Sequence, residues 1–507
     1  MELDGHQRNE TKVMKILMLP WLAHGHVSPF LELSKLLATK NFHIFFCSTS
    51  IILHSIQSKL PQNLLSSSNI ELVELTLPTS ADLPRCRHTT AGLPSHLMFS
   101  LKRAFDSAAS AFDSIVRNLR PDLVIYDFLQ PWAPAVALSA DIPAVMFQCT
   151  GALMAALVTN MLKFPNSDFP SMFPEIRLSA FEIKQLKNLF RSSVNDAKDK
   201  QRIQECYERS CGILLLKSFR EIEAKYIDFL STSLQIKVIP VGPLVEEQDE
   251  DIEVLAESIE KWLNKKEKKS CILVSFGSEF YLSKGDMEEI AHGLELSHLN
   301  FIWVVRFPAS GEGERKKRNN VEEELPKGFL ERVGERGMVV EEWVPQAQIL
   351  KHRSTGGFLS HCGWSSVLES LKFGVPIIAA PMQLDQPLNA RLVEHLGVGV
   401  VVERSCGGRL CWREVARAVR EVVAEESGKG VREKMKEFAK IMKEKGDKDE
   451  MEVVAEEITK LCRRKKKGLQ SNWCRTSMDS HCCEVMKIDD HNGTATPNKA
   501  EGLLANK

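Results

Sequence analysis

The chain has no long apolar run. Nowhere do about 18 apolar residues follow one another, so no membrane-spanning helix is predicted. Its thirteen cysteines include no C-x-x-C pair and no zinc-like spacing, which indicates free thiols in a reducing compartment. The first dozen residues are polar, so no secretory signal peptide is expected. Together these absences predict a cytoplasmic protein with no membrane partner.

The sequence also lacks an excess of charge of either sign. The 66 Lys and Arg residues balance 67 Asp and Glu residues, for a formal net charge of -1, so no general attraction to nucleic acid is predicted. Basic runs at Lys265–Lys269, Arg315–Arg318 and Arg463–Lys467 are interpreted as solvated loops or helix ends, in preference to targeting or nucleic-acid patches. The 507 residues can form two domains that each bury a core, and we expect a monomer.

What the chain does contain is a regular alternation of apolar strands and amphipathic helices. In the first half, strands are predicted at Lys15–Pro20, His43–Thr49 and Asp122–Tyr126, with a long helical stretch at 97–119. Ser28 is expected to cap a helix that has Pro29 in its first turn.

The second half repeats the alternation. Its predicted strands are Cys271–Phe276, Phe301–Arg306, Met338–Val340, Gly357–Ser360, Pro376–Ala380 and Val398–Val402. Continuous apolar strands between helices indicate parallel sheets covered on both faces, and therefore an α/β fold with two Rossmann-like domains. The predicted organisation is a first domain at 1–244, a linker at 245–254, a second domain at 255–450, a final amphipathic helix at 451–467 and a disordered polar tail at 468–507.

Polar side chains with ligand-binding chemistry gather between residues 343 and 386, at the ends of predicted strands. Ligands bind at the carboxyl edge of open parallel sheets. Trp343 offers an aromatic platform for a planar base, and the amide of Gln346 can bond a ribose hydroxyl. His361 ends a strand, and the tight turn at Gly363 leads into a helix whose first N–H groups, with the hydroxyls of Ser365 and Ser366, form an anion site.

Three further positions extend this set. Glu369 lies one helical turn on and can accept from ribose hydroxyls, and Asp385 and Gln386 can bind sugar hydroxyls. Ser278, in the loop after another strand, offers a further phosphate contact. A nucleotide that carries two phosphates and a sugar suits the whole group.

A candidate catalytic pair comes from the first half. His26 follows the first strand and Asp127 ends DLVIY, so both lie at the carboxyl edge of one predicted sheet. A carboxylate beside an imidazole orients the ring and stabilises its protonated form. His26 could then remove a proton from an attacking hydroxyl, a step worth roughly 10²–10⁴ in rate. His24 is a competing candidate base, and on the plainer interpretation Asp127 only caps a loop.

The run from Trp343 to Gln386 resembles, nearly position for position, the 44-residue signature of plant UDP-sugar-dependent glycosyltransferases. That pattern runs W-x-P-Q, H-C-G-W-N-S, E, G-V-P, P and D-Q. This chain matches it at Trp343, Pro345, Gln346, His361, Cys362, Gly363, Trp364, Ser366, Glu369, Gly374, Pro376, Pro381, Asp385 and Gln386. The resemblance implies the GT-B arrangement, in which two Rossmann-like domains face a central cleft. The first domain would bind the acceptor, the second would bind the UDP-sugar, and the final helix would return to the first domain.

The resemblance also implies a role for each matching position. Uracil would contact Trp343, ribose would contact Gln346 and Glu369, phosphate would contact His361 and Ser366, and the sugar would contact Trp364, Asp385 and Gln386; Ser278, Val344, Gly363 and Ser365 complete the donor-binding set. The family's His-Asp pair falls on His26 and Asp127, and its motif favours His26 over His24 as the base. The UDP-sugar is a co-substrate, so no cofactor and no metal is expected.

One position departs from the pattern, because Ser365 stands where most of the family has Asn. Ser or Gly at this position is typical of a branch that adds sugar to a sugar already attached to the acceptor. The closing Gln386 is associated with glucose. The resemblance therefore implies an inverting transfer of glucose from UDP-glucose to a small-molecule glycoside of a flavonoid, triterpenoid or carotenoid-derived compound. Direct transfer to an aglycone hydroxyl, or use of another UDP-sugar, is the alternative.

Rival functions make different demands on the sequence. A nicotinamide-dependent oxidoreductase should show G-x-G-x-x-G after its first strand, where this chain has LPWLAHGHVSP. A protein that only binds nucleotide sugars would not need both His26 and Asp127. A metal-dependent transferase would use a D-x-D string, but Asp249-Glu-Asp251 lies in the acidic linker and is interpreted as solvated charge.

Overall fold

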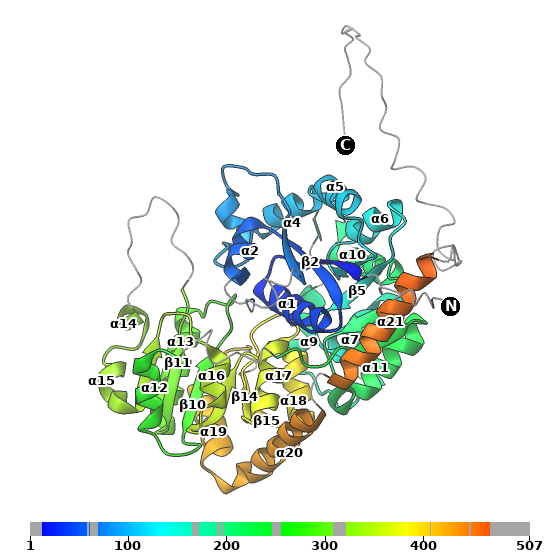
Figure 1. Ribbon diagram of the computed structural model, residues 1–507. Coiled ribbons are helices and arrows are strands. Elements are labelled where there is room, and N and C mark those ends of the chain that lie inside the picture. The colour runs from blue at the N-terminus through cyan, green and yellow to red at the C-terminus, as the bar shows by residue number, and fades with distance from the viewer. Residues whose placement is uncertain are drawn as a thin grey trace, which may run out of the picture. The chain divides into compact units, whose positions relative to one another are not determined.

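Two parallel sheets organise the chain, and each is built from the apolar runs seen in the sequence (Figure 1). The computed structural model describes residues 13–57, 60, 69–164, 172–189, 193–194, 197–245, 255–307, 321–405, 407–445 and 448–466. The described residues belong to one compact unit. The acidic linker with Asp249 and Asp251, and the tail from 468 onward, lie outside the described residues.

The first sheet has the strand order β3-β2-β1-β4-β5-β8-β9, with all its strands parallel. Its strands are β1 Met14–Leu19, β2 Phe42–Ser48, β3 Ile70–Glu74, β4 Leu123–Asp127, β5 Ala144–Gln148, β8 Ile213–Leu216 and β9 Lys237–Pro240. The inner strands are buried along most of their length because helices cover both faces, as their continuous apolar sequences predicted. We refer to this sheet and its helices as the first lobe.

The helices of the first lobe connect these parallel strands. They are α1 His24–Thr39, α2 Ser50–Gln57, α4 Met98–Asp106, α5 Ala109–Leu119, α6 Trp132–Ser139, α7 Ala152–Lys163, α9 Ala180–Leu189, α10 Asp199–Glu208 and α11 Arg220–Leu234. Short 3-10 turns lie at η1 Arg85–Arg87 and η2 Ser95–Leu97, and β6 Ser193–Val194 pairs antiparallel with β7 Ala197–Lys198. The predicted helical stretch at 97–119 is in fact two helices, divided at Ser107 and Ala108.

The start of α1 also differs from the prediction. The helix begins at His24 and not beyond Ser28, because the N–H groups of His26 and Val27 both bond the Ala23 carbonyl at 2.9 Å. Pro29 consequently lies inside the helix, where it cannot donate to the carbonyl of Gly25. The predicted cap at Ser28 was therefore wrong, and His26 belongs to the first helical turn.

The second sheet has the order β12-β11-β10-β13-β14-β15, again with parallel pairing. Its strands are β10 Cys271–Ser275, β11 Asn300–Val304, β12 Gly337–Val340, β13 Thr355–Ser360, β14 Ile377–Ala379 and β15 Gly399–Val401. Its helices are α12 Glu257–Asn264, α13 Lys284–Ser297, α14 Val321–Glu324, α15 Phe329–Val333, α16 Gln346–Lys351, α17 Trp364–Phe373, α18 Gln386–His395, α19 Trp412–Val423 and α20 Lys429–Lys445, with 3-10 turns η3 Gly334–Arg336 and η4 Glu426–Gly428. This set is the second lobe.

The last described helix, α21 Lys448–Lys466, lies back against the first lobe, where Figure 1 shows it beside α11. It buries Met451, Val454 and Ile458 in the core that also contains the first sheet. That same core includes Trp364 and Val367 of α17, so apolar packing continues from one lobe into the other. The predicted domain boundaries stay predictions, since much of the linker region is not described.

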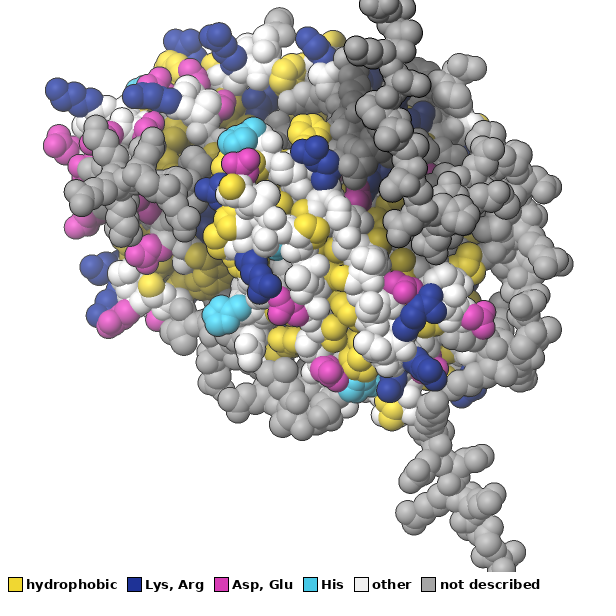
Figure 2. Space-filling view, turned by 90° about the horizontal axis from the view of Figure 1, so that it is seen from above, with side chains coloured by type: hydrophobic (Ala, Val, Ile, Leu, Met, Phe, Trp, Pro, Cys, Tyr) yellow, Lys and Arg dark blue, Asp and Glu magenta, His cyan; other side chains and the backbone are white. Residues whose placement is uncertain are grey.

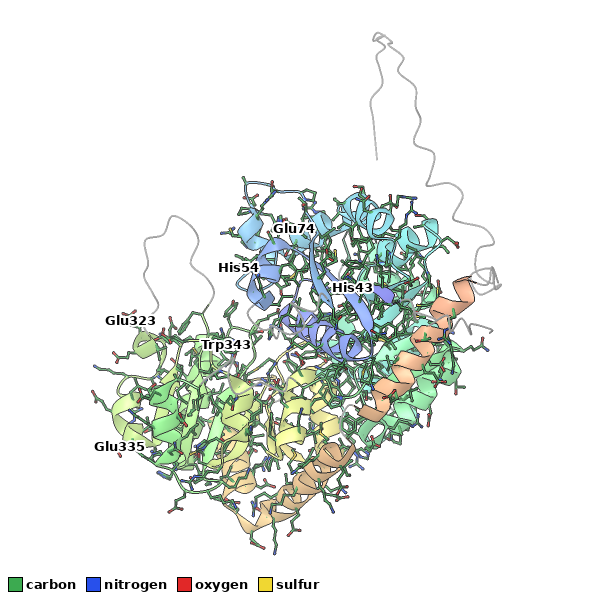
Figure 3. The ribbon with its side chains drawn as sticks, in the orientation of Figure 1. His43, His54, Glu74, Glu323, Glu335 and Trp343 are labelled. Carbon is green, nitrogen blue, oxygen red and sulfur yellow. The ribbon has the colours of Figure 1, made fainter. Side chains whose placement is uncertain are left out.

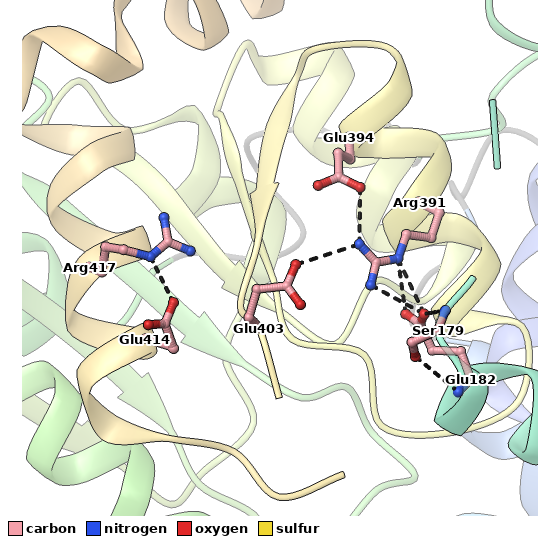
Figure 4. Close-up of polar contacts among 7 residues, drawn as sticks. All are labelled: Ser179, Glu182, Arg391, Glu394, Glu403, Glu414 and Arg417. Carbon is pink, nitrogen blue, oxygen red and sulfur yellow. Dashed lines mark hydrogen bonds and ion pairs between the residues drawn. The ribbon is translucent and has the colours of Figure 1, made fainter. Parts of the chain in front are cut away.

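Polar contacts also join the lobes. Arg391 of α18 pairs with Glu182 of α9 at 3.1 Å, and both side chains are largely buried (Figure 4). Glu182 also accepts the Ser179 N–H at 2.6 Å, and Arg391 reaches Glu394 at 3.0 Å. The Gln185 amide donates to the Met382 carbonyl at 3.1 Å. The orientation of the lobes is therefore held by specific hydrogen bonds as well as by apolar packing.

Among the described helices, none is both long enough and apolar enough to cross a membrane. On the face drawn in Figure 2, acidic and basic side chains are interspersed and do not gather by sign. That surface agrees with the balanced charge of the sequence.

Candidate active site

A cavity of about 300 Å³ lies where the carboxyl edges of the two sheets face each other. Nearly all the residues predicted to bind donor or acceptor line it: His26, Ser278, Trp343, Val344, Gln346, His361, Gly363, Trp364, Ser365, Ser366, Glu369, Asp385 and Gln386. Asp127 is the one predicted site residue outside this lining, because it is fully buried behind His26. The fold therefore brings two regions more than 200 residues apart to one place.

His26 and Asp127 form the predicted pair. The His26 Nδ1 atom lies 2.8 Å from Asp127 Oδ2, and the imidazole is still 19% exposed toward the cavity. Backbone N–H groups of Trp21 and Phe128 donate to the same carboxylate at 3.1 and 2.7 Å. The carboxylate is thus fixed and can only accept, so Nδ1 carries the proton and Nε2 is left as the basic nitrogen.

The pKa of His26 is raised above its ordinary value of 6.5. Burial acts in the opposite direction and lowers it, but the charge and hydrogen bond of Asp127 prevail, with smaller contributions from Glu279 and Asp385. His24 is exposed, and its backbone N–H donates to Glu279 at 2.9 Å. The structure thus pairs the Asp127 carboxylate with His26 and not with His24, and the role of His26 as the base stays a prediction.

His361 lies between two glycines at the floor of the cavity. A Cβ atom added at Gly277 or at Gly363 would stand 2.7 or 2.6 Å from His361 Nε2, so only glycine fits at either position. Burial lowers the pKa of His361 to about 4, although a bond to the Ser275 backbone opposes the shift. The ring is therefore neutral near pH 7. Its buried Nδ1 has no hydrogen-bond partner among the described residues, as expected of an atom that meets a ligand.

The first turn of α17 supplies the predicted anion site. Gly363 is the N-cap, so the N–H groups of the next residues have no partner inside the helix. The Gln346 amide donates to Ser366 Oγ at 3.2 Å and to Glu369 Oε2 at 2.7 Å, which gathers these three side chains on one wall. Amide, hydroxyl and carboxylate groups in this arrangement can bind a ribose beside a phosphate.

Asp385 also lines the cavity, close enough to His26 for the two charges to interact. Burial raises the pKa of Asp385, while the Asn389 amide, bonded to Asp385 at 2.9 Å, lowers it. Asn389 also donates to the Cys362 carbonyl at 3.0 Å, which ties this wall to the turn before α17. The side-chain oxygen Oε1 of Gln386 accepts the Met382 and Gln383 N–H groups, so the side-chain amide of Gln386 is oriented by its own loop.

Trp343 closes the far end of the cavity. Its ring is 48% exposed, and Figure 3 shows it at the edge of the second lobe nearer to the first lobe, with Glu335 at the opposite end of the same lobe. A large exposed ring beside a polar cavity is a surface on which a planar base can stack. Val344, next in the chain, is buried and anchors this segment in the core.

Comparison with known proteins shows which enzymes share these features. The family model for UDP-glucoronosyl and UDP-glucosyl transferases matches residues 116–446. The chain belongs to the UDP-glycosyltransferase family. Its co-substrate is a UDP-sugar and its acceptor is a small molecule, as the resemblance of the 343–386 run implied.

Individual relatives align with this UDP-glycosyltransferase over nearly its whole length. Mogroside IIIx synthase from Siraitia grosvenorii is 50% identical over 460 residues, which are 90% of this chain and 94% of that protein. Beta-D-glucosyl crocetin beta-1,6-glucosyltransferase from Gardenia jasminoides is 46% identical over 446 residues, 88% of this chain and 98% of the relative. The crystal structure of Glycyrrhiza uralensis UGT73P12, complexed with glycyrrhetinic acid 3-O-monoglucuronide, has a TM-score of 0.76 at 22% identity and covers 90% of this chain and 98% of its own. That structure confirms the GT-B fold with two Rossmann-like domains.

Some charged residues of this UDP-glycosyltransferase site were not identified by the sequence analysis. Lys217 and Glu279 both line the cavity, and both follow apolar strands, β8 and β10. Glu279 accepts the His24 N–H and the Thr90 hydroxyl, at 2.9 and 2.6 Å, and so joins the second lobe to the first. A charged residue at the end of an apolar strand was the available signal for both.

Trp364 has a different contact from the predicted one. Its indole N–H donates to the Lys217 carbonyl at 2.6 Å, and the side chain is buried between the lobes. A sugar contact from this residue therefore has to come from its backbone N–H at the start of α17. The predicted role in sugar binding stays a prediction, carried by a different atom.

Cys149 adds a thiol beside the His26–Asp127 pair. One ligand atom from each of His26, Asp127 and Cys149 lies within 4.8 Å of the others. Burial, followed by the charge of Asp127, raises the pKa of Cys149 well above its usual range, while Lys217 lowers it. His26 and Asp127 are already joined to each other at 2.8 Å, and Cys149 stands beside that pair in the cavity lining.

Proposed function

We propose that this UDP-glycosyltransferase transfers glucose from UDP-glucose to a hydroxyl group of a small-molecule glycoside, with inversion at the anomeric carbon and without a metal ion. The observation that carries the proposal is the His26–Asp127 pair, joined at 2.8 Å, in the wall of the cavity that the donor motif lines. A base held this way has its free nitrogen available to an acceptor hydroxyl.

The reaction follows from that geometry. His26 Nε2 takes the proton of the acceptor hydroxyl while Asp127 stabilises the resulting imidazolium, and such assistance is worth roughly 10²–10⁴ in rate. The acceptor oxygen bonds the anomeric carbon from the side opposite UDP, the bond to the β-phosphate oxygen breaks, and the configuration inverts. The N–H groups at the start of α17 stabilise the departing phosphate.

Each residue that we place in the UDP-sugar site binds one part of that molecule. We assign uracil to Trp343, ribose to Gln346 and Glu369, the phosphates to His361 and Ser366, and the sugar to Asp385 and Gln386. Burial lowers the pKa of His361 to about 4, so the ring of the ligand-free site is neutral near pH 7 and can offer an N–H to a phosphate oxygen.

A second cavity of about 520 Å³ adjoins the first and offers room for the acceptor. Apolar side chains of Leu31, Ile52 and Ile56 line it together with the polar groups of Glu32 and Arg306. That mixture suits a molecule that joins an apolar aglycone to sugar hydroxyls. Thr89 and Ala91, from the segment between β3 and α4, also contribute to this lining.

The relatives support a glycoside as the acceptor, because beta-D-glucosyl crocetin, in the name of the Gardenia enzyme, already carries glucose. Ser365 in place of Asn agrees with the same branch. The alternative, transfer to the free aglycone or from another UDP-sugar, predicts a different preference. An acceptor screen with UDP-glucose compares each aglycone with its monoglucoside and identifies products by mass. A clear preference for free aglycones would refute the glycoside proposal.

Two further measurements test the chemistry. The His26→Ala variant should lose turnover by roughly 10²-fold or more while it still binds UDP, since only the base is removed. Near-normal turnover would end the assignment of His26.

The metal-independent mechanism has its own test. Activity should be unchanged after treatment with EDTA, and a loss of activity that a divalent cation restores would contradict the mechanism.

A further inference from the structure

A lysine from the first lobe reaches into the phosphate-binding wall of the second. Lys217 follows β8, lines the cavity and is only 2% exposed. We infer that Lys217 is a donor-binding residue, whose ammonium group contacts the diphosphate of the UDP-sugar and stabilises the charge that UDP gains as the sugar leaves. The inference rests on the proposed function of this cavity.

Three contacts fix Lys217 against the first turn of α17. Its Nζ atom lies 2.7 Å from Ser365 Oγ. Its carbonyl accepts the Trp364 indole N–H at 2.6 Å, and its own N–H donates to the Gln148 carbonyl at 2.9 Å. Both the backbone and the end of the side chain are thus held where the helix begins.

The electrostatics of this position favour an anion. A helix N-terminus carries partial positive charge, so cations normally gather at the opposite end of a helix. Here a buried ammonium stands beside the N-terminus of α17, and one of its partners is the neutral hydroxyl of Ser365. A diphosphate held between Lys217, the free N–H groups and His361 would bring its negative charge against this positive wall.

The chemistry of transfer requires such a charge. The anomeric C–O bond breaks with its electron pair on the β-phosphate oxygen, so the diphosphate becomes more negative by one unit. The proton of the acceptor hydroxyl goes to His26 and the new C–O bond forms at the acceptor oxygen. A fixed cation at the leaving group stabilises this transition state more than the bound substrate.

Ser365 and Lys217 are best understood together. The Ser365 side chain is short, and the Lys217 ammonium occupies the space next to its hydroxyl. The pair places a hydrogen-bond donor beside the start of α17 by using a side chain from each lobe. An Asn at position 365 would supply a donor from the second lobe alone, which suggests a rescue experiment.

The test compares Lys217→Met, which keeps the length of the side chain, with Lys163→Met, which removes an exposed charge at the end of α7. Calorimetry measures the binding of UDP and of uridine, which lacks the phosphates. We expect Lys217→Met to weaken UDP about 10- to 100-fold and to leave uridine unchanged, as for the loss of one charged hydrogen bond. Its kcat should fall about 100-fold. Lys163→Met should behave as the wild type.

The outcomes separate the possible roles. Unchanged UDP affinity and kcat in Lys217→Met, or equal losses for UDP and uridine, would overturn the inference, the second by showing a purely structural role. Adding Ser365→Asn to Lys217→Met should restore part of the UDP affinity. If Lys217→Met does not fold, Lys217→Gln gives the same comparison of UDP with uridine. Failure of the wild type to bind UDP would instead refute the proposed function.

Discussion

At the scale of single residues, the pKa of His26 depends on two opposing effects. Burial disfavours the imidazolium, and the Asp127 carboxylate at 2.8 Å favours it more strongly, so the pKa rises above 6.5. Only the neutral ring can accept a proton. Activity should therefore be lost as pH falls through the raised pKa, at a higher pH than an unpaired histidine would give.

The pH profile of kcat/KM tests this. In the wild type the acidic limb should have its midpoint above pH 6.5. In Asp127→Asn the midpoint should move to lower pH, because the stabilising charge is gone, and the maximum should fall by roughly 10²–10⁴ through loss of the oriented tautomer. An unchanged midpoint in this variant would show that Asp127 does not set the pKa of the base.

Steric contact matters as much as charge at His361. Gly363 has an ordinary backbone conformation, with φ of -57°, so the variant Gly363→Ala adds only a methyl group, whose Cβ would lie 2.6 Å from His361 Nε2. The ring must shift, and with it the phosphate contact.

We expect Gly363→Ala to weaken UDP binding by about 10-fold or more, the equivalent of one lost hydrogen bond. Gly430→Ala is the matched control, since a Cβ there meets nothing within 4 Å and the residue lies in α20. The control should bind UDP as the wild type does. Calorimetric titration with UDP measures the affinity of both variants. Equal UDP affinities of Gly363→Ala and Gly430→Ala would refute the steric argument.

At the scale of elements, a buried carboxylate joins two helices of the first lobe. Glu223 of α11 accepts the N–H groups of Ala152 and Leu153, each at 2.8 Å, and the Ser218 hydroxyl at 2.6 Å. It thereby caps α7 from outside, and the α11 backbone departs from helical values at this residue. Burial raises its pKa to about 7, although these three hydrogen bonds lower it.

This shift has a consequence for stability. Between pH 4.5 and about 7 the folded state holds a proton on Glu223 that the unfolded state has released, so the contribution to stability is lost as pH rises through the folded pKa. The free energy of unfolding of the wild type, relative to Glu223→Gln, should fall between pH 5 and 8 by at most about 3 kcal/mol. Urea unfolding at several pH values measures this difference, and a difference that does not vary with pH would contradict it.

The start of α1 was the main error of element prediction. The Ser28-Pro29 pair is a genuine signal for a helix start, yet the helix begins at His24. Its early N–H groups and the chain before it are held by partners distant in sequence, with Asp127 accepting from Trp21 and Glu279 from His24. Tertiary hydrogen bonds of this kind cannot be inferred from local propensity.

At the scale of the whole molecule, the two lobes meet through the Glu182–Arg391 ion pair in a buried setting. A second pair in Figure 4, Glu414–Arg417 at 2.7 Å, lies within α19, and its side chains are 36% and 41% exposed. The two pairs share their chemistry and differ in burial, so they should differ in energy.

Double-mutant cycles should show that difference. For Glu182→Gln and Arg391→Met we expect a coupling of about 1–3 kcal/mol in the free energy of unfolding, because either single change leaves a largely buried charge without its contact across the two lobes. For Glu414→Gln and Arg417→Met we expect less than about 0.5 kcal/mol. Equal coupling energies in both cycles would mean that the Glu182–Arg391 pair stabilises the fold no more than the Glu414–Arg417 pair does.

The sequence by itself determined the α/β alternation and the UDP-sugar-binding residues of the second lobe, because both depend on residues that are close together in the chain. Strand ends, helix starts and the residues between Trp343 and Gln386 follow one another in the chain, so their spacing is enough to predict one shared edge. Only the tertiary structure decided that Lys217 meets Ser365, that Glu279 meets His24 and that Asp385 faces His26. Those contacts join positions more than a hundred residues apart across the joint between two lobes. They depend on how the apolar surfaces of the lobes pack, which the spacing of residues along the chain does not encode.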